Sequence, residues 1–338
     1  MIRTLITIGD PSGIGPEISL KAVDKLIDEN FDFIPILVGD KAVIKKAKTI
    51  SGIKKNLFSL AENEKPNKSE IFFIDTDIIK DERFPLCNDN KISGRASFTY
   101  LELAWQLLKK HVGDCIVTAP ISKKAWNLAN IPYKGHTDAL SDMSGEKTYM
   151  LMNAENLQVL LATTHIPLKQ IWKYLTAEYL FSCTKLTVEF LEKFFETDDI
   201  KIGFCGLNPH AGETGTIGTE ENTIIRPVVE KLIASNFHAS GPYPADSIFR
   251  NALSHHLFNL IVSLYHDQAL IVLKTLFFEK HVNITVNASG WIRTSPAHGT
   301  AFDIAWKNMA DFSSMQQAIK IAAAMARKKQ HGYISHPQ

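Results

Sequence analysis

The chain has 338 residues, of which 45% are hydrophobic and 22% charged, and its formal net charge is +1. This length and composition are typical of a globular protein with a substantial core and favour two domains. The near balance of 37 basic and 36 acidic residues gives no basis for general binding to nucleic acid or to an acidic membrane surface, so any anion site must be local.

Cysteine use and the ends of the chain bear on its compartment. The four cysteines (Cys87, Cys115, Cys183 and Cys205) are widely spaced and form no CxxC pair, so we expect reduced core thiols and a reducing cytoplasm. Residues 1–8 lack the charged and apolar regions of a signal peptide, and the longest apolar runs are too short to span a bilayer. The sequence therefore predicts a cytoplasmic protein without a membrane partner.

Strands and helices alternate along the chain. Apolar runs predict strands, and helical spacing of apolar residues predicts helices. In chain order, the expected strands are 5–10, 33–40, 71–75, 114–120, 159–165, 201–208 and 260–267. The expected helices are 16–27, 41–48, 97–111, 177–195, 221–235 and 313–329. Residues 61–69 are expected to form a polar loop, 80–95 an irregular segment and 331–338 a loose tail. This alternation predicts a mainly parallel sheet covered by helices.

The segment GDPSGIGPE (9–17) joins the first strand to the first helix. Its glycines permit close backbone approach, and a helix start offers free N–H groups to an anion. The segment is neither GxGxxG nor a P-loop, and a tight strand–helix turn explains it without a ligand.

Two later motifs also have two interpretations. In TAPISK (118–123), the hydroxyls and Lys123 are suited to a phosphate or carboxylate, but a capped helix start with a solvated lysine is an alternative. In GHTD (135–138), His136 and Thr137 form either an oxyanion or phosphate clamp or an ordinary surface turn.

Three histidines each follow an apolar run, namely His165, His210 and His266. In open α/β sheets, ligands collect beyond the carboxyl ends of the strands. Three neutral imidazoles with an open fourth position are typical of a catalytic divalent-metal site. One such histidine would be a hydrogen-bonded strand-end residue. Three in equivalent contexts make the metal site an equal alternative.

Other polar residues follow the later strands. The glycine- and acid-rich stretch 208–221 fits a loop that carries a ligand and opens a helix. Asp246 is placed as a helix N-cap. Lys274 and Arg293, beyond strand ends, suggest binding of a doubly charged phosphate, although each alone is typical of a surface charge.

Together these motifs resemble the 4-hydroxythreonine-4-phosphate dehydrogenase family of vitamin B6 synthesis. The matching segments run in family order from residue 9 to residue 305. They are GDPSGIGPE, TAPISK, GHTD, GLNPHAGETGTIGTEE, GPYPADSIF, YHDQ and IRTSPAHGTAFDIA. Several are long and unusual, so their combination is highly specific.

The resemblance implies a fold like that of isocitrate and isopropylmalate dehydrogenases, with an active-site cleft between two α/β domains. We expect a first domain of residues 1–130 plus 300–338, and a second of 131–299 that carries the metal ligands. The resemblance also implies a homodimer whose active sites take residues from both subunits. The implied cofactors are NAD or NADP and one divalent ion per subunit, Zn²⁺, Mg²⁺ or Co²⁺.

The resemblance assigns roles to individual positions but leaves the cofactor-binding residues unassigned. The metal ligands are His165, His210 and His266. The substrate-binding positions are His136, Thr137, Lys274, Asn283 and Arg293. The candidate general bases are Asp246, Asp267 and Lys274.

One stretch departs from the family pattern. Where the family has a Gly-Leu-Pro turn before IRTS, this chain has VNASGW (286–291), one residue longer. Ala297 and Ala269 replace a usual aspartate and glycine. In the family this neighbourhood helps to build the nicotinamide-nucleotide site, so we expect its dinucleotide contacts to differ.

The implied reaction is metal-dependent oxidation by NAD of 4-phosphooxy-L-threonine to 2-amino-3-oxo-4-phosphooxybutanoate, which decarboxylates to 3-amino-2-oxopropyl phosphate for pyridoxal 5'-phosphate. Two alternatives stay open. One is a paralogous oxidative decarboxylase of threonate or erythronate 4-phosphate. The other is a non-redox metalloprotein that binds phosphate esters and has lost its dinucleotide site.

Overall fold

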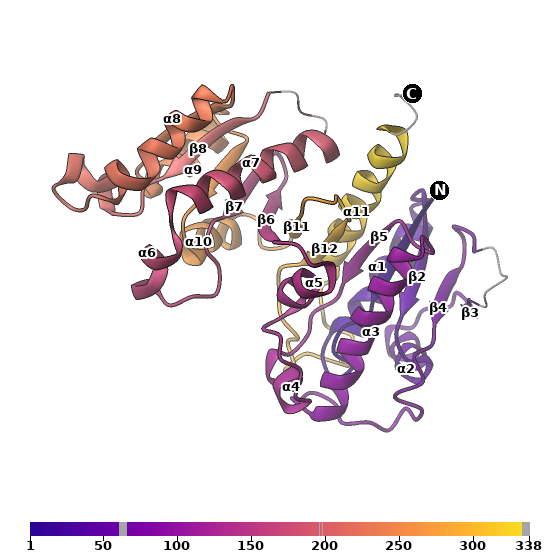
Figure 1. The fold of residues 1–338 in the computed structure, drawn as a ribbon. Coiled ribbons are helices and arrows are strands. Elements are labelled where there is room, and N and C mark those ends of the chain that lie inside the picture. Colours follow the sequence, from indigo (N-terminus) through magenta and orange to yellow (C-terminus); the bar gives the residue numbers. More distant parts are fainter. Residues whose placement is uncertain (61–65, 196, 198, 333–338) are drawn as a thin grey trace. The chain divides into compact units, whose positions relative to one another are not determined.

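The computed structural model describes residues 1–60, 66–195, 197 and 199–332 (Figure 1). Contacts divide the chain into two compact units. Unit 1 comprises Met1–Gly145 and Trp291–Gln338, and unit 2 comprises Glu146–Gly290. The chain therefore passes from one unit to the other after Gly145 and after Gly290.

Unit 1 is built on parallel strands in the order β3-β4-β2-β1-β5-β12. The strands are β1 (Ile2–Thr7), β2 (Phe33–Val38), β3 (Leu57–Ser59), β4 (Ile71–Ile74), β5 (Cys115–Thr118) and β12 (Arg293–Pro296). The helices are α1 (Gly15–Asp28), α2 (Lys41–Ser51), α3 (Lys91–Lys109), α4 (Lys123–Leu128), α5 (His136–Ser144) and α11 (Ser313–Gly332).

Two strands of unit 1, β2 and β5, are buried along their whole length. All six residues of β2 and all four of β5 are buried, a pattern typical of parallel strands covered by helices. Helix α3 packs on β1, β2 and β5, while α11 packs on β1, β5 and β12 with α1 beside it. The core of unit 1 thus lies between its sheet and these helices.

Unit 2 is built on strands in the order β11-β6-β7-β10-β8-β9. The strands are β6 (Tyr149–Ala154), β7 (Leu157–Leu161), β8 (Lys201–Cys205), β9 (His238–Tyr243), β10 (Leu260–Ser263) and β11 (His281–Val286). The α-helices are α6 (Ile171–Tyr174), α7 (Ala177–Phe194), α8 (Arg226–Ala234), α9 (Ala245–His255) and α10 (His266–Leu276). The short helical segments are η1 (Leu168–Gln170), η2 (Pro209–Gly215) and η3 (Glu221–Ile225).

The sheet of unit 2 is mixed. Strands β7, β10, β8 and β9 are parallel, and β6 runs antiparallel to both β7 and β11. The register pairs Ser263 with Leu161 and Val262 with Phe204, so β7, β10 and β8 end at the same edge. Three loops that leave this edge carry the three histidines singled out from the sequence.

The structure confirms the predicted fold class, a two-unit α/β architecture with mainly parallel strands. The predicted domain limits after 130 and 299 differ from the observed divisions after Gly145 and Gly290. Helix α5 belongs to unit 1, where His136 makes an edge contact with Trp126. Strand β12 also belongs to unit 1, because it pairs with β5.

Two sequence expectations about local structure are corrected. Helix α3 begins at Lys91, so the segment expected to be irregular ends earlier than residue 95. Cys87 is exposed, whereas Cys115, Cys183 and Cys205 are buried free thiols. Burial raises the pKa of Cys115 to about 12, which keeps this thiol protonated. Most of the expected loop 61–69 and of the expected tail 331–338 lies outside the described residues.

Within the described part of the chain, none of the helices has the length and apolar character needed to cross a lipid bilayer.

Candidate active site

The edge of unit 2 where β7, β10 and β8 end brings two of the three histidines together. His165 lies four residues beyond the end of β7, and His266 begins α10 directly after the β10 loop. Their ring centroids are 5.4 Å apart. Two imidazoles bound tetrahedrally to one zinc ion would have ring centroids about 5 Å apart, given Zn–N distances of about 2.0–2.1 Å. The spacing of this pair therefore fits two ligands of one divalent ion.

A carboxylate orients the second of these rings. Nδ1 of His266 lies 2.7 Å from Oδ1 of Asp267, and the His266 side chain is 35% exposed. A hydrogen bond from one ring nitrogen to a carboxylate is the usual second contact of a metal-bound histidine, because it fixes the tautomer and leaves the other nitrogen for the metal. Asp267 is thus placed to orient His266.

The third histidine lies on a loop of unusual backbone conformation. His210 to Thr214 all have φ between +43° and +78°, the left-handed region. For residues other than glycine this conformation costs about 1–2 kcal/mol each, so surrounding contacts must hold the loop. The described residues contain no group of three or more His, Cys, Asp or Glu side chains that could hold a metal ion. The role of His210 as a third ligand stays a prediction.

Glu221 supplies contacts that hold this loop. Its side chain is buried, and Oε1 accepts hydrogen bonds from the backbone N–H of Leu207 at 2.8 Å and of Asn208 at 2.7 Å. Gly212 lies against the same carboxylate, because a Cβ there would be 2.5 Å from Oε2 of Glu221. Sequence reasoning noted Glu221 only as one acid of a dense stretch. A buried acid closing a glycine-rich loop has no local sequence signal beyond that density.

The remaining candidates of unit 2 lie on separate elements. Asp246 is exposed in the first turn of α9, where Pro244 takes the N-cap position, so the expected cap at Asp246 is wrong. Lys274 is exposed in the last turn of α10. Asn283 lies on β11, and its Oδ1 is a buried oxygen without a hydrogen-bond partner among the described residues. Such an oxygen is suited to accept a hydrogen bond from a ligand.

Unit 1 contributes a buried guanidinium. Arg293 on β12 is only 2% exposed, and its Nε and Nη2 donate to Oγ1 of Thr118 at 3.1 and 2.6 Å. Burial lowers the pKa of Arg293 to about 9, so the group keeps its charge at neutral pH. A buried guanidinium next to a threonine hydroxyl is well suited to an anionic ligand.

His136 begins α5 near this arginine. Its Nε2 is buried and has no hydrogen-bond partner among the described residues, although the residue as a whole is only half-buried. Burial, and then the nearby charge of Arg293, hold the pKa of His136 well below its ordinary value. The ring is therefore neutral at pH 7. Thr137 follows it in the first turn of α5.

The GDPSGIGPE segment is explained by packing within unit 1. A Cβ at Gly9 would lie 2.4 Å from the carbonyl oxygen of Pro120, and one at Gly15 would lie 2.4 Å from that of Ile8. These glycines therefore let neighbouring backbone segments approach one another. The structure favours the tight-turn interpretation of this motif.

Asp10 in the same segment is fully buried. Its Oδ1 accepts a hydrogen bond from the N–H of Ser12 at 2.8 Å, and its Oδ2 has no partner among the described residues. Burial raises the pKa of Asp10 from its ordinary value of 3.8 to about 6. Burial without a cationic partner is the reason, since charging this carboxyl is costly there.

TAPISK likewise forms a capped helix start. Ser122 is the N-cap of α4, and its Oγ accepts a hydrogen bond from the N–H of Ala125 at 3.1 Å. Oγ of Ser122 also donates to Asp89. Lys123 is the first residue of α4. The capping interpretation of Ser122 is confirmed. The hydroxyl of Thr118 accepts hydrogen bonds from Arg293.

The stretch that departs from the family pattern forms a closed turn. Oδ1 of Asn287 accepts a hydrogen bond from the N–H of Gly290 at 2.7 Å, and Gly290 has φ of +70°. Trp291 then packs its ring edge-on against Trp105 within unit 1, with centroids 5.2 Å apart. The longer segment is therefore ordered by an Asn–Gly turn and an aromatic pair.

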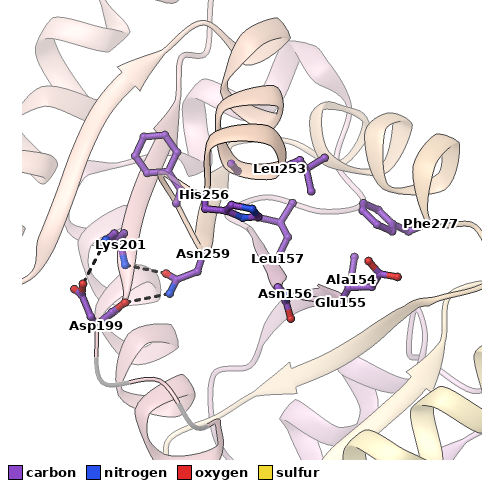
Figure 2. A pocket seen from close by; sticks show the side chains of 12 residues that line it. Ala154, Glu155, Asn156, Leu157, Asp199, Lys201, Leu253, His256, Asn259 and Phe277 are labelled. Carbon is purple, nitrogen blue, oxygen red and sulfur yellow. Dashed lines mark hydrogen bonds and ion pairs between the residues drawn. The ribbon is translucent and has the colours of Figure 1, made fainter.

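A pocket of about 330 Å³ in unit 2 is lined by none of His165, His210 and His266 (Figure 2). Leu157, Lys201 and Asn259 line it, and each lies at or next to the first residue of its strand, whereas the histidines follow the last residues. Figure 2 shows that polar groups of the pocket bind one another: Oδ1 of Asn259 accepts from the backbone N–H of Lys201 at 2.8 Å, and Nζ of Lys201 lies 3.6 Å from Oδ2 of Asp199. This pocket contains none of the predicted site residues.

These features define a class: a two-unit α/β protein with histidine donors at the carboxyl edge of mainly parallel strands and a buried arginine in the other unit. The family model of the pyridoxal phosphate biosynthetic protein PdxA matches residues 32–322. The chain belongs to this family.

Named relatives agree with the family. A 4-hydroxythreonine-4-phosphate dehydrogenase from Sulfurihydrogenibium sp. (strain YO3AOP1) is 40% identical over 97% of this chain and 99% of its own length. A Clostridium botulinum (strain Langeland) protein with the provisional name D-threonate 4-phosphate dehydrogenase is 36% identical, with 96% of each chain covered. The crystal structure of 4-hydroxythreonine-4-phosphate dehydrogenase from Klebsiella pneumoniae superposes with a TM-score of 0.83 at 30% identity, covering 96% of this chain and 100% of that one.

Proposed function

We propose that this protein is a cytoplasmic, metal-dependent, NAD(P)-linked oxidoreductase that oxidises 4-phosphooxy-L-threonine to 2-amino-3-oxo-4-phosphooxybutanoate. The product loses CO₂ to give 3-amino-2-oxopropyl phosphate for pyridoxal 5'-phosphate synthesis. The proposal is supported by family membership together with one structural observation, the pairing of His165 and His266 at 5.4 Å on the edge where strands β7 and β10 end.

We assign the metal to His165 and His266, with His210 as the third ligand. When bound, a divalent ion supplies Lewis-acid chemistry that lowers the pKa of the substrate hydroxyl. The chain's own part is to hold the two rings at the observed spacing and to orient His266 through Asp267. A bound NAD or NADP would supply the hydride acceptor, and the protein's part would be to orient it.

The anionic end of the substrate is assigned to residues with unused or charged donors. Arg293 keeps its positive charge in a buried position, and neutral His136 presents a buried Nε2. Thr137, Lys274 and Asn283 are assigned to the substrate on the family pattern. A buried charged donor gives a phosphate or carboxylate both affinity and orientation, which lowers the entropic cost of the reaction.

Oxidation of the alcohol also requires a group that takes the hydroxyl proton. Asp246, Asp267 and Lys274 remain the candidates. The hydrogen bond between Asp267 and His266 assigns Asp267 a positioning role, which favours Asp246 or Lys274 as the base. Replacing the base should lower kcat, whereas replacing a positioning residue should lower metal affinity.

A second substrate is favoured by one observation, the relative with the provisional D-threonate 4-phosphate name at 36% identity. D-Threonate 4-phosphate has a hydroxyl where 4-phosphooxy-L-threonine has an amino group. The same metal and phosphate contacts would serve both, so only the contacts to this one substituent would differ. The kcat/KM ratio of the two substrates measures that difference.

We further propose a homodimer, supported by exposed apolar side chains that follow two of the histidines in sequence. Trp172 on α6 is 60% exposed and Ile271 on α10 is 65% exposed. Large exposed apolar side chains of this kind are typical of surfaces that bind another chain. Trp172→Ser with Ile271→Ser should shift the protein from dimer to monomer in analytical ultracentrifugation. The same pair of changes at the exposed Leu128 and Met309 of unit 1 is the control.

The experiment that tests the proposal is NADH formation by metal-stripped protein, before and after addition of Zn²⁺, Mg²⁺ or Co²⁺. Each metal is tested with 4-phosphooxy-L-threonine and with D-threonate 4-phosphate. Metal-restored turnover of the first substrate supports the proposal, and turnover of only the second supports the sugar-acid alternative. Metal binding without oxidation of either substrate by NAD or NADP would overturn the redox assignment.

A further inference from the structure

The loops that carry the three histidines are tied together beyond the ends of their strands. After β7, the N–H of Ala162 donates to the carbonyl oxygen of Ser263 at 2.8 Å. One residue further, Oγ1 of Thr163 donates to the carbonyl oxygen of Leu264 at 2.6 Å. The β7 and β10 loops thus stay in register until two residues before His165 and His266.

One side chain connects this pair of loops to the third. Gln268 lies in the first turn of α10 and is only 8% exposed. Its Oε1 accepts hydrogen bonds from the N–H of Leu264 at 2.7 Å and from Oγ of Ser263 at 3.1 Å. Its Nε2 donates to the carbonyl oxygen of Gly206 at 2.8 Å. A single carboxamide therefore joins the β10 loop to the β8 loop that leads to His210.

The β8 loop needs such a connection. The segment from His210 to Thr214 is in the left-handed region, and its conformation depends on how the residues before it are held. Gly206 is held on one side by Tyr243, whose carbonyl oxygen accepts its N–H at 2.7 Å. Gln268 holds the carbonyl group of the same residue. Because the contact joins loops from different strands, nothing in local sequence would replace it.

We propose that Gln268 is a positioning residue that sets the spacing of the three histidine-bearing loops. The inference rests on the proposed function, since the loops are assigned to a divalent metal. Gln268 acts through the backbone of the loops and touches neither metal nor substrate in this assignment. Its amide is required because the site needs one acceptor and one donor, directed at two different loops.

The test compares Gln268→Met with Gln158→Met in the full-length protein. The control removes a glutamine of the same unit whose Nε2 donates to Oδ1 of Asn153 at 3.1 Å, at the start of β7 and away from the histidine edge. Two readouts are taken well below the melting temperature. One is hydrogen exchange of the peptide covering residues 206–215, measured without metal, and the other is the dissociation constant for Co²⁺ or Zn²⁺.

We expect Gln268→Met to speed exchange in 206–215 at least tenfold and to raise the metal dissociation constant about 10- to 100-fold, the range found for outer contacts of metal ligands. Gln158→Met should change neither. Gln268→Glu keeps the acceptor for Leu264 but opposes two oxygens at Gly206, so it should free the β8 loop alone. Unchanged exchange and unchanged affinity in Gln268→Met would overturn the inference.

The two readouts separate this inference from the proposed function. If the wild-type protein binds no metal through its histidines, the function fails while hydrogen exchange still decides whether Gln268 holds the loops. If metal binds and only the melting temperature of Gln268→Met falls, Gln268 is merely structural and the positioning role is rejected.

Discussion

The segment after β1 in unit 1 and the histidine-bearing loops of unit 2 follow strand ends but differ in how they are used. In unit 1, the segment after β1 is filled by the protein itself: Gly9 and Gly15 lie against backbone carbonyl groups, and Asp10 is fully buried. In unit 2, the loops after β7 and β8 place His165 and His210 at the surface, and His266 is about one-third exposed. Both regions carry motifs of the same family, but the segment after β1 is closed by packing, whereas the histidine-bearing loops of unit 2 present donors.

This difference shows that a family motif can be present for either of two reasons, because the fold requires it or because the chemistry requires it. A glycine that meets backbone within 2.4 Å is needed for the fold, whether or not a ligand is near. An exposed histidine contributes little to packing, so its presence at a strand end points to chemistry. Substitutions in the two regions should therefore separate into effects on stability and effects on activity.

The largest expected effect is at the histidines. His266→Ala or His210→Ala should lower metal-dependent NADH formation by at least about 10³-fold, because either change removes one of the three proposed ligands of the metal that would lower the pKa of the substrate hydroxyl. The free energy of unfolding should change by less than about 0.5 kcal/mol, as is usual for surface positions. His238→Ala is the matched control, since Nδ1 of His238 contacts Oδ1 of Asp199 at 2.6 Å elsewhere in unit 2. If His266→Ala lost its fold rather than its activity alone, the view that the histidine loops serve chemistry and not stability would be wrong.

Two glycine substitutions test whether the segment after β1 is required for packing. Gly9→Ala should lower the free energy of unfolding by about 3 kcal/mol or more, because φ is +72° and the new Cβ would meet the carbonyl oxygen of Pro120. Gly52→Ala has a similar φ of +66° but open space around it, so it should cost only about 1–2 kcal/mol. Chemical denaturation measures both. If Gly9→Ala instead leaves stability intact and abolishes cofactor binding, the segment is a ligand loop.

Much of this architecture could be predicted from the sequence. Continuous apolar runs indicated the strands that became β1, β2, β5, β7, β8 and β10, because strands buried on both faces carry no polar alternation. The placement of His165 and His266 beyond their strand ends followed from the same runs. Local patterns suffice where burial is uniform along an element.

Elements that depend on tertiary contacts could not be predicted this way. Strand β12 has the sequence RTSP, and its burial follows from pairing with β5 rather than from apolar character. The start of α3 was obscured by Gly94, a weak helix former that is needed because a Cβ there would lie 2.1 Å from the carbonyl oxygen of Ala125. Gln268 and Glu221 were likewise recognisable only from their partners in space.

The raised pKa of Asp10, in the segment after β1, predicts how the free energy of unfolding depends on pH. Its pKa is raised from 3.8 to about 6, so the folded state binds the proton more tightly than the unfolded state does. Its contribution to stability is therefore fully present below about pH 3.8 and is lost as pH rises through about 6, a change of roughly 3 kcal/mol. Asp10→Asn should remove this dependence, matching the parent at acidic pH and exceeding its stability at pH 7.5. If the free energies of unfolding of the two proteins instead differed by the same amount at every pH from 4 to 7.5, Asp10 would not titrate in this range.

The smallest expected effect concerns Asp267, which lies beside His266 on the histidine-bearing loops of unit 2. Asp267→Asn keeps the size of the side chain and its contact with Nδ1 of His266 but removes the negative charge that favours the metal-binding tautomer. We expect the metal dissociation constant to rise about tenfold, with the free energy of unfolding unchanged within about 0.5 kcal/mol. Asp199→Asn removes the charge from the corresponding pair with His238 and should leave metal binding as it is.

If Asp267 were instead the general base, kcat would fall by about 10² or more while metal affinity stayed the same, because proton transfer rather than ligand geometry would be lost. The ratio of these two effects in one variant thus decides whether the carboxylate beside His266 serves the metal or the substrate.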